Sequence, residues 1–274
     1  MSATQTNKRA STFSWQGDQA YVASLGTLTA NSFTQPTRYR KLYRVTNAAI
    51  IDAEKDSYHA DATDDDNSCW AASTANMLAY TGWGAQGLGL SQSNTLEDTL
   101  FSYFTTNFAY GATRGGHQLL GLSWFFDGTY KQKGNADWDQ PLAGGNTLGI
   151  SATPYVSYSV VSTNTRYSNA ITSLALMEKL ATSLKNGDAV SLDINTNHGG
   201  HAITCWGYSY NPAVSSSSTS YYTGIFISDS DDDKDLENPQ DAINYLPLTY
   251  SGKYYYNNFV AFYPSFSITG ITTL

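Results

Sequence analysis

The chain has 274 residues, and 15 Lys and Arg stand against 23 Asp and Glu, which gives a formal net charge of -8. An acidic chain without a stripe of Lys and Arg has no surface that would displace phosphate counterions, which excludes nucleic acids and anionic membranes as partners. Hydrophobic residues make up 41% of the chain and charged residues only 14%, so 21 Tyr and many hydroxyl side chains supply the polarity. This composition predicts a globular protein with a substantial core.

These features of the sequence do not fix the cellular compartment of the protein. No apolar run approaches 18 residues, so we expect no membrane span. Residues 1–40 lack the basic-then-apolar pattern of a signal peptide, and two cysteines cannot build a disulfide framework. The protein is therefore either cytoplasmic or one whose signal has been removed.

No repeat of 20 to 50 residues and no linker divides the sequence, which predicts one domain over residues 1–274. Residues 1–45 are treated as an N-terminal extension without an assigned role. The only low-complexity stretch, residues 215–220, is rich in Ser and lies between two β-like runs, so it is expected to form a hairpin tip.

Helices are expected in the middle of the chain and strands at its end. The first helix should follow the capping residues 66–68, run from Cys69 to Tyr80 and end at Gly82. The other helical patterns are Thr95–Phe108, Leu119–Phe126 and Leu174–Leu184. The β-branched and aromatic runs are Ala189–Ile194, Ala202–Tyr210, Tyr221–Asp229 and Asn258–Tyr263. This order predicts an α+β fold in which a helical half packs on an antiparallel sheet.

Cys69 falls in the first turn of the first predicted helix. The helix dipole and the unpaired N–H groups at such a position favour the thiolate, which is the reactive form of cysteine. The same N–H groups would stabilise the oxyanion that forms when a thiolate attacks a carbonyl. The alternative is a cysteine that is simply a small buried hydrophobic residue.

His201 is the predicted partner of Cys69. It lies about 130 residues downstream, as in papain-like enzymes, and opens a strand directly after Gly199 and Gly200. Two glycines at this point would allow close approach of a substrate chain. The alternative for any single histidine is a structural role in the core.

A hairpin centred on the Ser-rich tip would place Asp229 opposite His201. The same register pairs Ile203 with Ile227 and Cys205 with Ile225, so these side chains should be buried. Asp229 would then orient the imidazole and stabilise its protonated form.

A metal site is the alternative explanation for the acidic and histidine residues. Residues 229–235 carry oxygen side chains at alternate positions, as a calcium loop does, but Lys234 stands where Gly is needed and Gln240 where a bidentate Glu is needed. Residues 64–66 are three Asp that would favour a helix N-terminus as a solvated run. The spacing of His198 and His201 suits no zinc site, so we expect no metal.

Five sequence features together resemble the IdeS/Mac family of bacterial immunoglobulin-degrading cysteine proteases. They are Asp52-Ala-Glu-Lys55, Cys69-Trp-Ala-Ala with Asn76-Met-Leu78, Gly115-Gly116 with Trp124 to Gly128, His201-Ala-Ile-Thr-Cys-Trp206-Gly207, and Asp229-Ser-Asp231. They occur in the order that the family shows and cover about residues 50 to 263. The resemblance implies a papain-like fold, a cofactor-free catalytic triad and a secreted or cell-surface location.

Transferred residue by residue, the resemblance implies that Cys69 is the nucleophile, His201 the base, Asp229 the orienting acid and Asp231 a supporting acid. Lys55 would donate to the oxyanion, which papain-like enzymes achieve with a Gln that is absent here, because Thr63 stands in its place. The alternative for Lys55 is a solvated surface side chain.

The implied reaction is the cleavage of an immunoglobulin heavy chain near its hinge, through an acyl-enzyme. Two other functions stay open at this level. The first is a non-catalytic module that binds a host protein, a role that the Tyr and Ser content suits. The second is a deamidase or acyltransferase that uses the same thiol chemistry.

Overall fold

The computed structural model describes residues 10–15, 18–23, 33–34, 43–45, 51–53, 55, 67–93, 95–108, 116–128, 144–161, 170–196, 199–230, 243–257 and 265–274. The helices are α1 (Cys69–Thr81), α2 (Trp83–Leu88), α3 (Leu96–Asn107), α5 (Gln118–Asp127) and α6 (Ser173–Asn186). The strands are β1 (Ala10–Trp15), β2 (Asp18–Ala23), β3 (Phe33–Thr34), β4 (Tyr43–Val45), β5 (Ser157–Val161), β6 (Ala170–Ile171), β7 (Val190–Thr196), β8 (Gly199–Tyr210), β9 (Tyr222–Ser228), β10 (Ile243–Pro247), β11 (Thr249–Tyr250), β12 (Tyr254–Asn257) and β13 (Ser265–Thr273).

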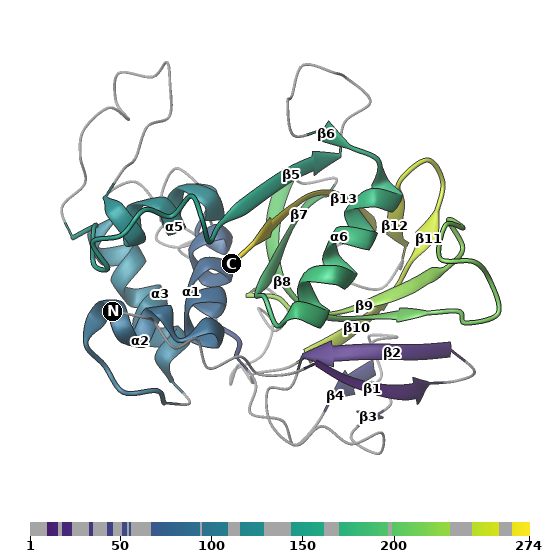
Figure 1. Ribbon diagram of the computed structural model, residues 1–274, viewed down its shortest axis with the longest axis horizontal. Coiled ribbons are helices and arrows are strands. Elements are labelled where there is room, and N and C mark those ends of the chain that lie inside the picture. The colour runs from purple at the N-terminus through teal and green to yellow at the C-terminus, as the bar shows by residue number, and fades with distance from the viewer. Residues whose placement is uncertain are drawn as a thin grey trace, which may run out of the picture.

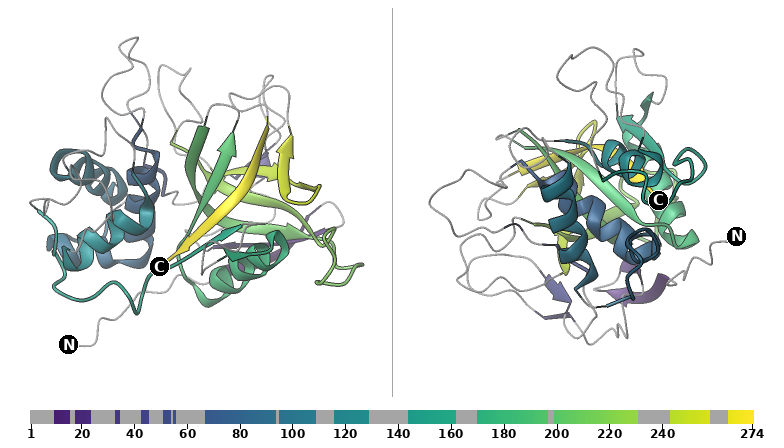
Figure 2. Two further views of the ribbon diagram at one scale, coloured as in Figure 1. Left: turned by 90° about the horizontal axis from the view of Figure 1, so that it is seen from above. Right: turned by 90° about the vertical axis from the view of Figure 1, so that its left-hand side faces the viewer.

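The fold is α+β, as the order of the sequence patterns predicts. Helices α1, α2, α3 and α5 form a group beside the sheet, and α6 lies across the sheet itself (Figure 1). The described strands follow the order β11-β12-β13-β7-β8-β9-β10-β4-β3, with β2 on β8 and β5 on β13. The strand pairs are antiparallel except for β5 with β6. Figure 2 shows the helical group and the sheet side by side.

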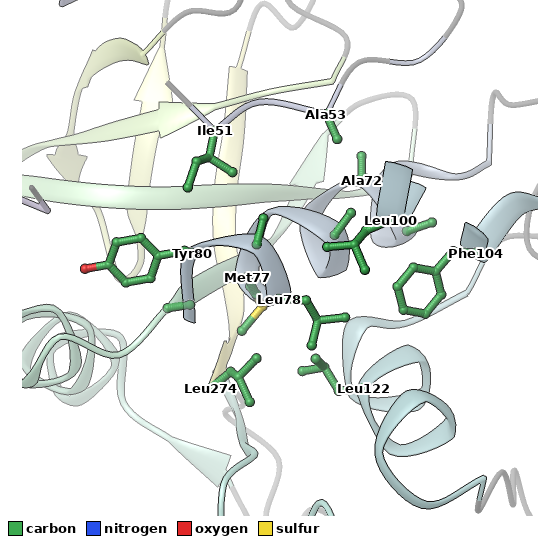
Figure 3. Packing of buried hydrophobic residues seen from close by; sticks show 14 of the residues in the cluster. Ile51, Ala53, Ala72, Met77, Leu78, Tyr80, Leu100, Phe104, Leu122 and Leu274 are labelled. Atoms are coloured by element: carbon green, nitrogen blue, oxygen red, sulfur yellow. The ribbon is translucent and has the colours of Figure 1, made fainter. Parts of the chain in front are cut away.

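Two apolar clusters hold these parts together. The first joins the helical group to the sheet and includes Met77 and Leu78 of α1, with Leu100 of α3, Leu122 of α5 and the C-terminal Leu274 (Figure 3). The second lies between α6 and the sheet and contains residues such as Leu180, Leu192 and Ile203. Nearly every side chain of α1 is buried, so the helix that begins with Cys69 has a fixed place in the fold.

Buried hydroxyl and amide groups fix α1 on the sheet. Ser73 donates to Ser191 of β7 at 2.7 Å, and Asn76 donates to Thr204 of β8 at 3.0 Å. Asn76 also bonds to Ser228 of β9 at 3.3 Å. Since buried polar groups require defined partners, this network sets the position of α1 along the strands more strictly than apolar contacts do.

The helix predictions are confirmed to within about two residues at each end. Helix α2 is missed because it has six residues, two of them glycine, and gives little periodic signal. The strands within residues 1–45 are also missed, and their sheet pairing shows that this extension takes part in the fold: β2 pairs with β8 and β4 pairs with β10. The predicted strand Asn258–Tyr263 lies outside the described residues.

The hairpin register is wrong by two residues near the site. Cys205 pairs with Ile227, not with Ile225, and Thr204 pairs with Ser228. The pairing shifts between Cys205 and Gly207 and again near Tyr210, because strand irregularities change how many residues oppose each other. The prediction assumed two regular strands. Cys205 is nevertheless fully buried, as expected.

None of the helices in the described part of the chain combines the length and the apolar character needed to cross a bilayer.

Candidate active site

A pocket of about 340 Å³ opens where the N-terminus of α1 meets the first residues of β8. Cys69 and Trp70 line it from α1, and Gly200, His201 and Ala202 line it from β8. The rest of its wall comes from the start of α5, from β7 and from β13, namely Gly116, His117, Gln118, Asp193, Ile194, Asn195 and Thr269. Its volume lies at the lower end of the range for ligand sites, about 300 to 1,000 Å³.

Cys69 is the first residue of α1 and is only partly buried. Ser68 takes the N-cap position, as expected, although its side chain makes no capping bond. Its carbonyl instead accepts from the N–H groups of Ala71 and Ala72 at 2.7 and 3.1 Å. The first turn of α1 holds no acidic residue, so nothing in that turn opposes the positive end of the helix dipole at the sulfur.

His201 and Asp229 form a short, buried pair. Nε2 of His201 lies 2.6 Å from Oδ1 of Asp229, and His201 is only 8% exposed. Continued along the strands, the observed register would set Asp229 opposite Ile203, so the two side chains meet diagonally. The predicted partnership is therefore present, although the pairing proposed for it is wrong. The bond also leaves Nδ1 as the ring nitrogen available to Cys69.

The pKa values of Cys69 and His201 move toward a charged pair. Burial raises the pKa of the Cys69 thiol, but a hydrogen bond from His201, the charge of His201 and the N–H of Ala202 lower it by more, so that it lies below its usual value. Burial lowers the pKa of His201, yet the charge of Asp229 and its hydrogen bond, with a further contribution from Cys69, raise it to about 10. These opposite shifts favour a thiolate facing an imidazolium over two neutral groups.

Lys55 precedes Cys69 by 14 residues, and its backbone is held beside Asp229. Its N–H donates to the carbonyl of Ser230, next to Asp229, at 3.5 Å, and Ala53 donates to the side chain of Asn76 on α1 at 2.8 Å. The Lys55 side chain is 1% exposed, which contradicts the solvated alternative. Its positive charge is among the contributions that lower the pKa of Cys69.

Some predicted groups cannot be placed. Asp231 lies outside the described residues. The same is true of the calcium-like stretch after Ser230 and of the three Asp at positions 64–66. Within the ranges that are described, no group of three or more His, Cys, Asp or Glu side chains is arranged to hold a metal ion.

The sequence does not single out three polar side chains that also line the pocket. His117, Gln118 and Asp193 all line it, and Gln118 donates to Oδ1 of Asp193 at 3.0 Å. His117 caps α5, since its Nδ1 accepts from the N–H of Leu119 at 3.1 Å. No sequence signal could have joined these residues, because 75 positions separate Gln118 from Asp193 and nothing in either segment points to the other.

No protein-family model matches the chain, and no curated protein is significantly similar to it. The resemblance to the immunoglobulin-degrading proteases therefore stays a prediction.

Proposed function

We propose that the protein is a cysteine endopeptidase with a papain-like arrangement, in which Cys69 is the nucleophile, His201 the acid and base, and Asp229 the orienting carboxylate. One observation carries the proposal: a cysteine at a helix N-terminus shares an open pocket with a histidine that is bonded to a buried aspartate. Opposite pKa shifts in the cysteine and the histidine match the needs of nucleophilic catalysis.

In the first half of the reaction, the Cys69 thiolate would attack the carbonyl carbon of the scissile peptide bond. The carbonyl electrons move to its oxygen, and the N–H groups at the start of α1 and the Lys55 ammonium stabilise that charge. The tetrahedral intermediate then collapses. The C–N bond breaks, the imidazolium of His201 gives its proton to the leaving amine, and a thioester on Cys69 remains.

In the second half, water replaces the amine. Neutral His201 removes a proton from the water as the hydroxyl attacks the thioester carbonyl, and the C–S bond breaks when the second intermediate collapses. The products are a carboxylic acid and the thiolate, again paired with an imidazolium. Asp229 holds the ring in place through both halves and stabilises its charged form.

The proposed substrate is an immunoglobulin heavy chain, cut near its hinge. This assignment rests on the family resemblance alone. The test is to incubate IgG, IgA and IgM with the protein, with and without iodoacetamide, and to measure intact masses. Two heavy-chain fragments that iodoacetamide prevents would support the proposal.

Other outcomes of the same digestion would contradict the proposal. A mass gain of about one dalton without chain cleavage would show deamidation. Unchanged masses, together with complex formation, would show a binding module. Cleavage of another protein, with the antibodies left intact, would agree with a peptidase activity but would refute the immunoglobulin substrate.

The oxyanion role of Lys55 gives a separate prediction. One such donor contributes on the order of 10²- to 10³-fold to the rate, so Lys55→Ala should lower kcat by that order while KM changes little. Because Lys55 is buried, the variant's thermal melting curve must be measured alongside. A folded Lys55→Ala protein whose kcat falls less than about threefold would assign Lys55 a merely structural role.

A further inference from the structure

One wall of the catalytic pocket carries a carboxylate that the proposed mechanism does not use. Asp193 lies on β7 and lines the same cavity as Cys69 and His201. It is the only acidic residue in the described lining, and its side chain is 23% exposed, so it is accessible to a ligand.

The surrounding structure holds this carboxylate in a defined position. Oδ1 accepts from Gln118 at 3.0 Å, and Gln118 is itself fixed by a bond to Ser191 at 2.9 Å. A Cβ on Gly270 of β13 would lie only 2.5 Å from Oδ2, so the glycine makes room for the carboxylate. The pairing of β13 with β7 shifts between Ile268 and Gly270, and such irregularities redirect side chains beside binding sites.

His117 does not neutralise Asp193. Nδ1 of His117 accepts from the backbone N–H of Leu119, so the proton of the neutral ring sits on Nε2, which lies 3.3 Å from Oδ2 of Asp193. The negative charge of Asp193 therefore remains available.

We propose that Asp193 makes this pocket a subsite for a Lys or Arg side chain of the substrate, within two residues of the bond that is cleaved. The inference rests on the proposed peptidase function and specifies its substrate class. An extended chain advances about 3.3 to 3.6 Å per residue, so only residues next to the attacked carbonyl reach a cavity of about 340 Å³. An ammonium or guanidinium group would bond to the carboxylate oxygens, and the aliphatic stem would lie along the pocket wall.

The test compares fluorogenic peptides that carry Arg, Lys, citrulline or Glu at one position near the scissile bond. Citrulline has the shape of Arg without its charge. The wild-type protein should have a kcat/KM about tenfold to a hundredfold higher for Arg than for citrulline, the range expected of a hydrogen bond to a charged group. The preference should weaken as salt rises, because Asp193 is partly exposed.

Asp193→Asn keeps the acceptor for Gln118 and removes the charge, so the ratio of kcat/KM for the Arg peptide to that for the citrulline peptide should fall to about one. Asp188→Asn is the matched control, because it removes a carboxylate that does not line the pocket. Equal cleavage of the Arg and citrulline peptides by the wild-type protein, or a preference that survives in Asp193→Asn, would overturn the proposal.

A second measurement separates this proposal from the peptidase proposal. Methanethiosulfonates with an aminoethyl or a sulfonatoethyl group label Cys69 whether or not the protein cleaves peptides. The ratio of cationic to anionic labelling rates should fall about tenfold or more from wild type to Asp193→Asn. An unchanged ratio would overturn the subsite, whereas a fall in the ratio without cleavage of any peptide would refute only the peptidase.

Discussion

Cys69→Ala is expected to abolish turnover completely and to change the free energy of unfolding by no more than about 1 kcal/mol. The sulfur faces the pocket, so its loss removes the nucleophile without leaving a cavity in the core. His201 keeps Asp229 as a partner in the variant. Peptide cleavage and thermal melting measure the two parts of this prediction.

Alkylation provides the control for that result. Iodoacetamide near neutral pH should label Cys69 and spare Cys205, whose thiol is fully buried and whose pKa burial raises to about 12. Residual turnover in Cys69→Ala would remove Cys69 from the mechanism, and faster labelling of Cys205 than of Cys69 would contradict the burial of Cys205.

Asp229→Asn should have the next largest effect and should change the pH dependence as well as the rate. Below a pH of about 10, Asp229 keeps His201 protonated, and the imidazolium lowers the pKa of the Cys69 thiol. Without the negative charge, burial lowers the pKa of His201, so the alkaline limit of activity moves to lower pH. The thiolate loses its charged partner, so the acid limit moves to higher pH.

The bell-shaped profile of kcat/KM should therefore narrow from both sides, and the loss at the optimum can reach about 10⁴-fold, as in serine enzymes. Asp188→Asn serves again as the control for the loss of one carboxylate. Asp231→Asn should cost less activity, because it is assigned a supporting role. An unchanged pH profile in a folded Asp229→Asn protein would show that another group sets the pKa of His201.

The sequence predicts the local features of the site well, because local chemistry determines them. Small and capping residues around position 69 and the glycine at position 82 define α1, and α1 begins at Cys69 as expected. Likewise, the β-branched residues around His201 predict β8, and the alternation along that strand correctly buries Cys205.

The arrangement of distant parts was harder to predict. The hairpin register was wrong because it depends on irregularities near Trp206 that no residue pattern marks. The strands in residues 1–45 were missed because short strands gain their stability from partners such as β8 and β10. His117 and Asp193 came together only through tertiary packing, which individual residue patterns do not encode.

The most direct test of the central claim is to trap the acyl-enzyme. Wild-type protein would be mixed with a peptide substrate, quenched with acid within milliseconds to seconds and measured by intact-protein mass spectrometry, followed by digestion to locate the adduct. We predict a mass increase equal to the acyl half of the cleaved peptide, on the fragment that contains Cys69 and absent from Cys69→Ala. Peptide cleavage without any adduct on Cys69, or an adduct on another residue, would contradict the assignment of Cys69 as the nucleophile.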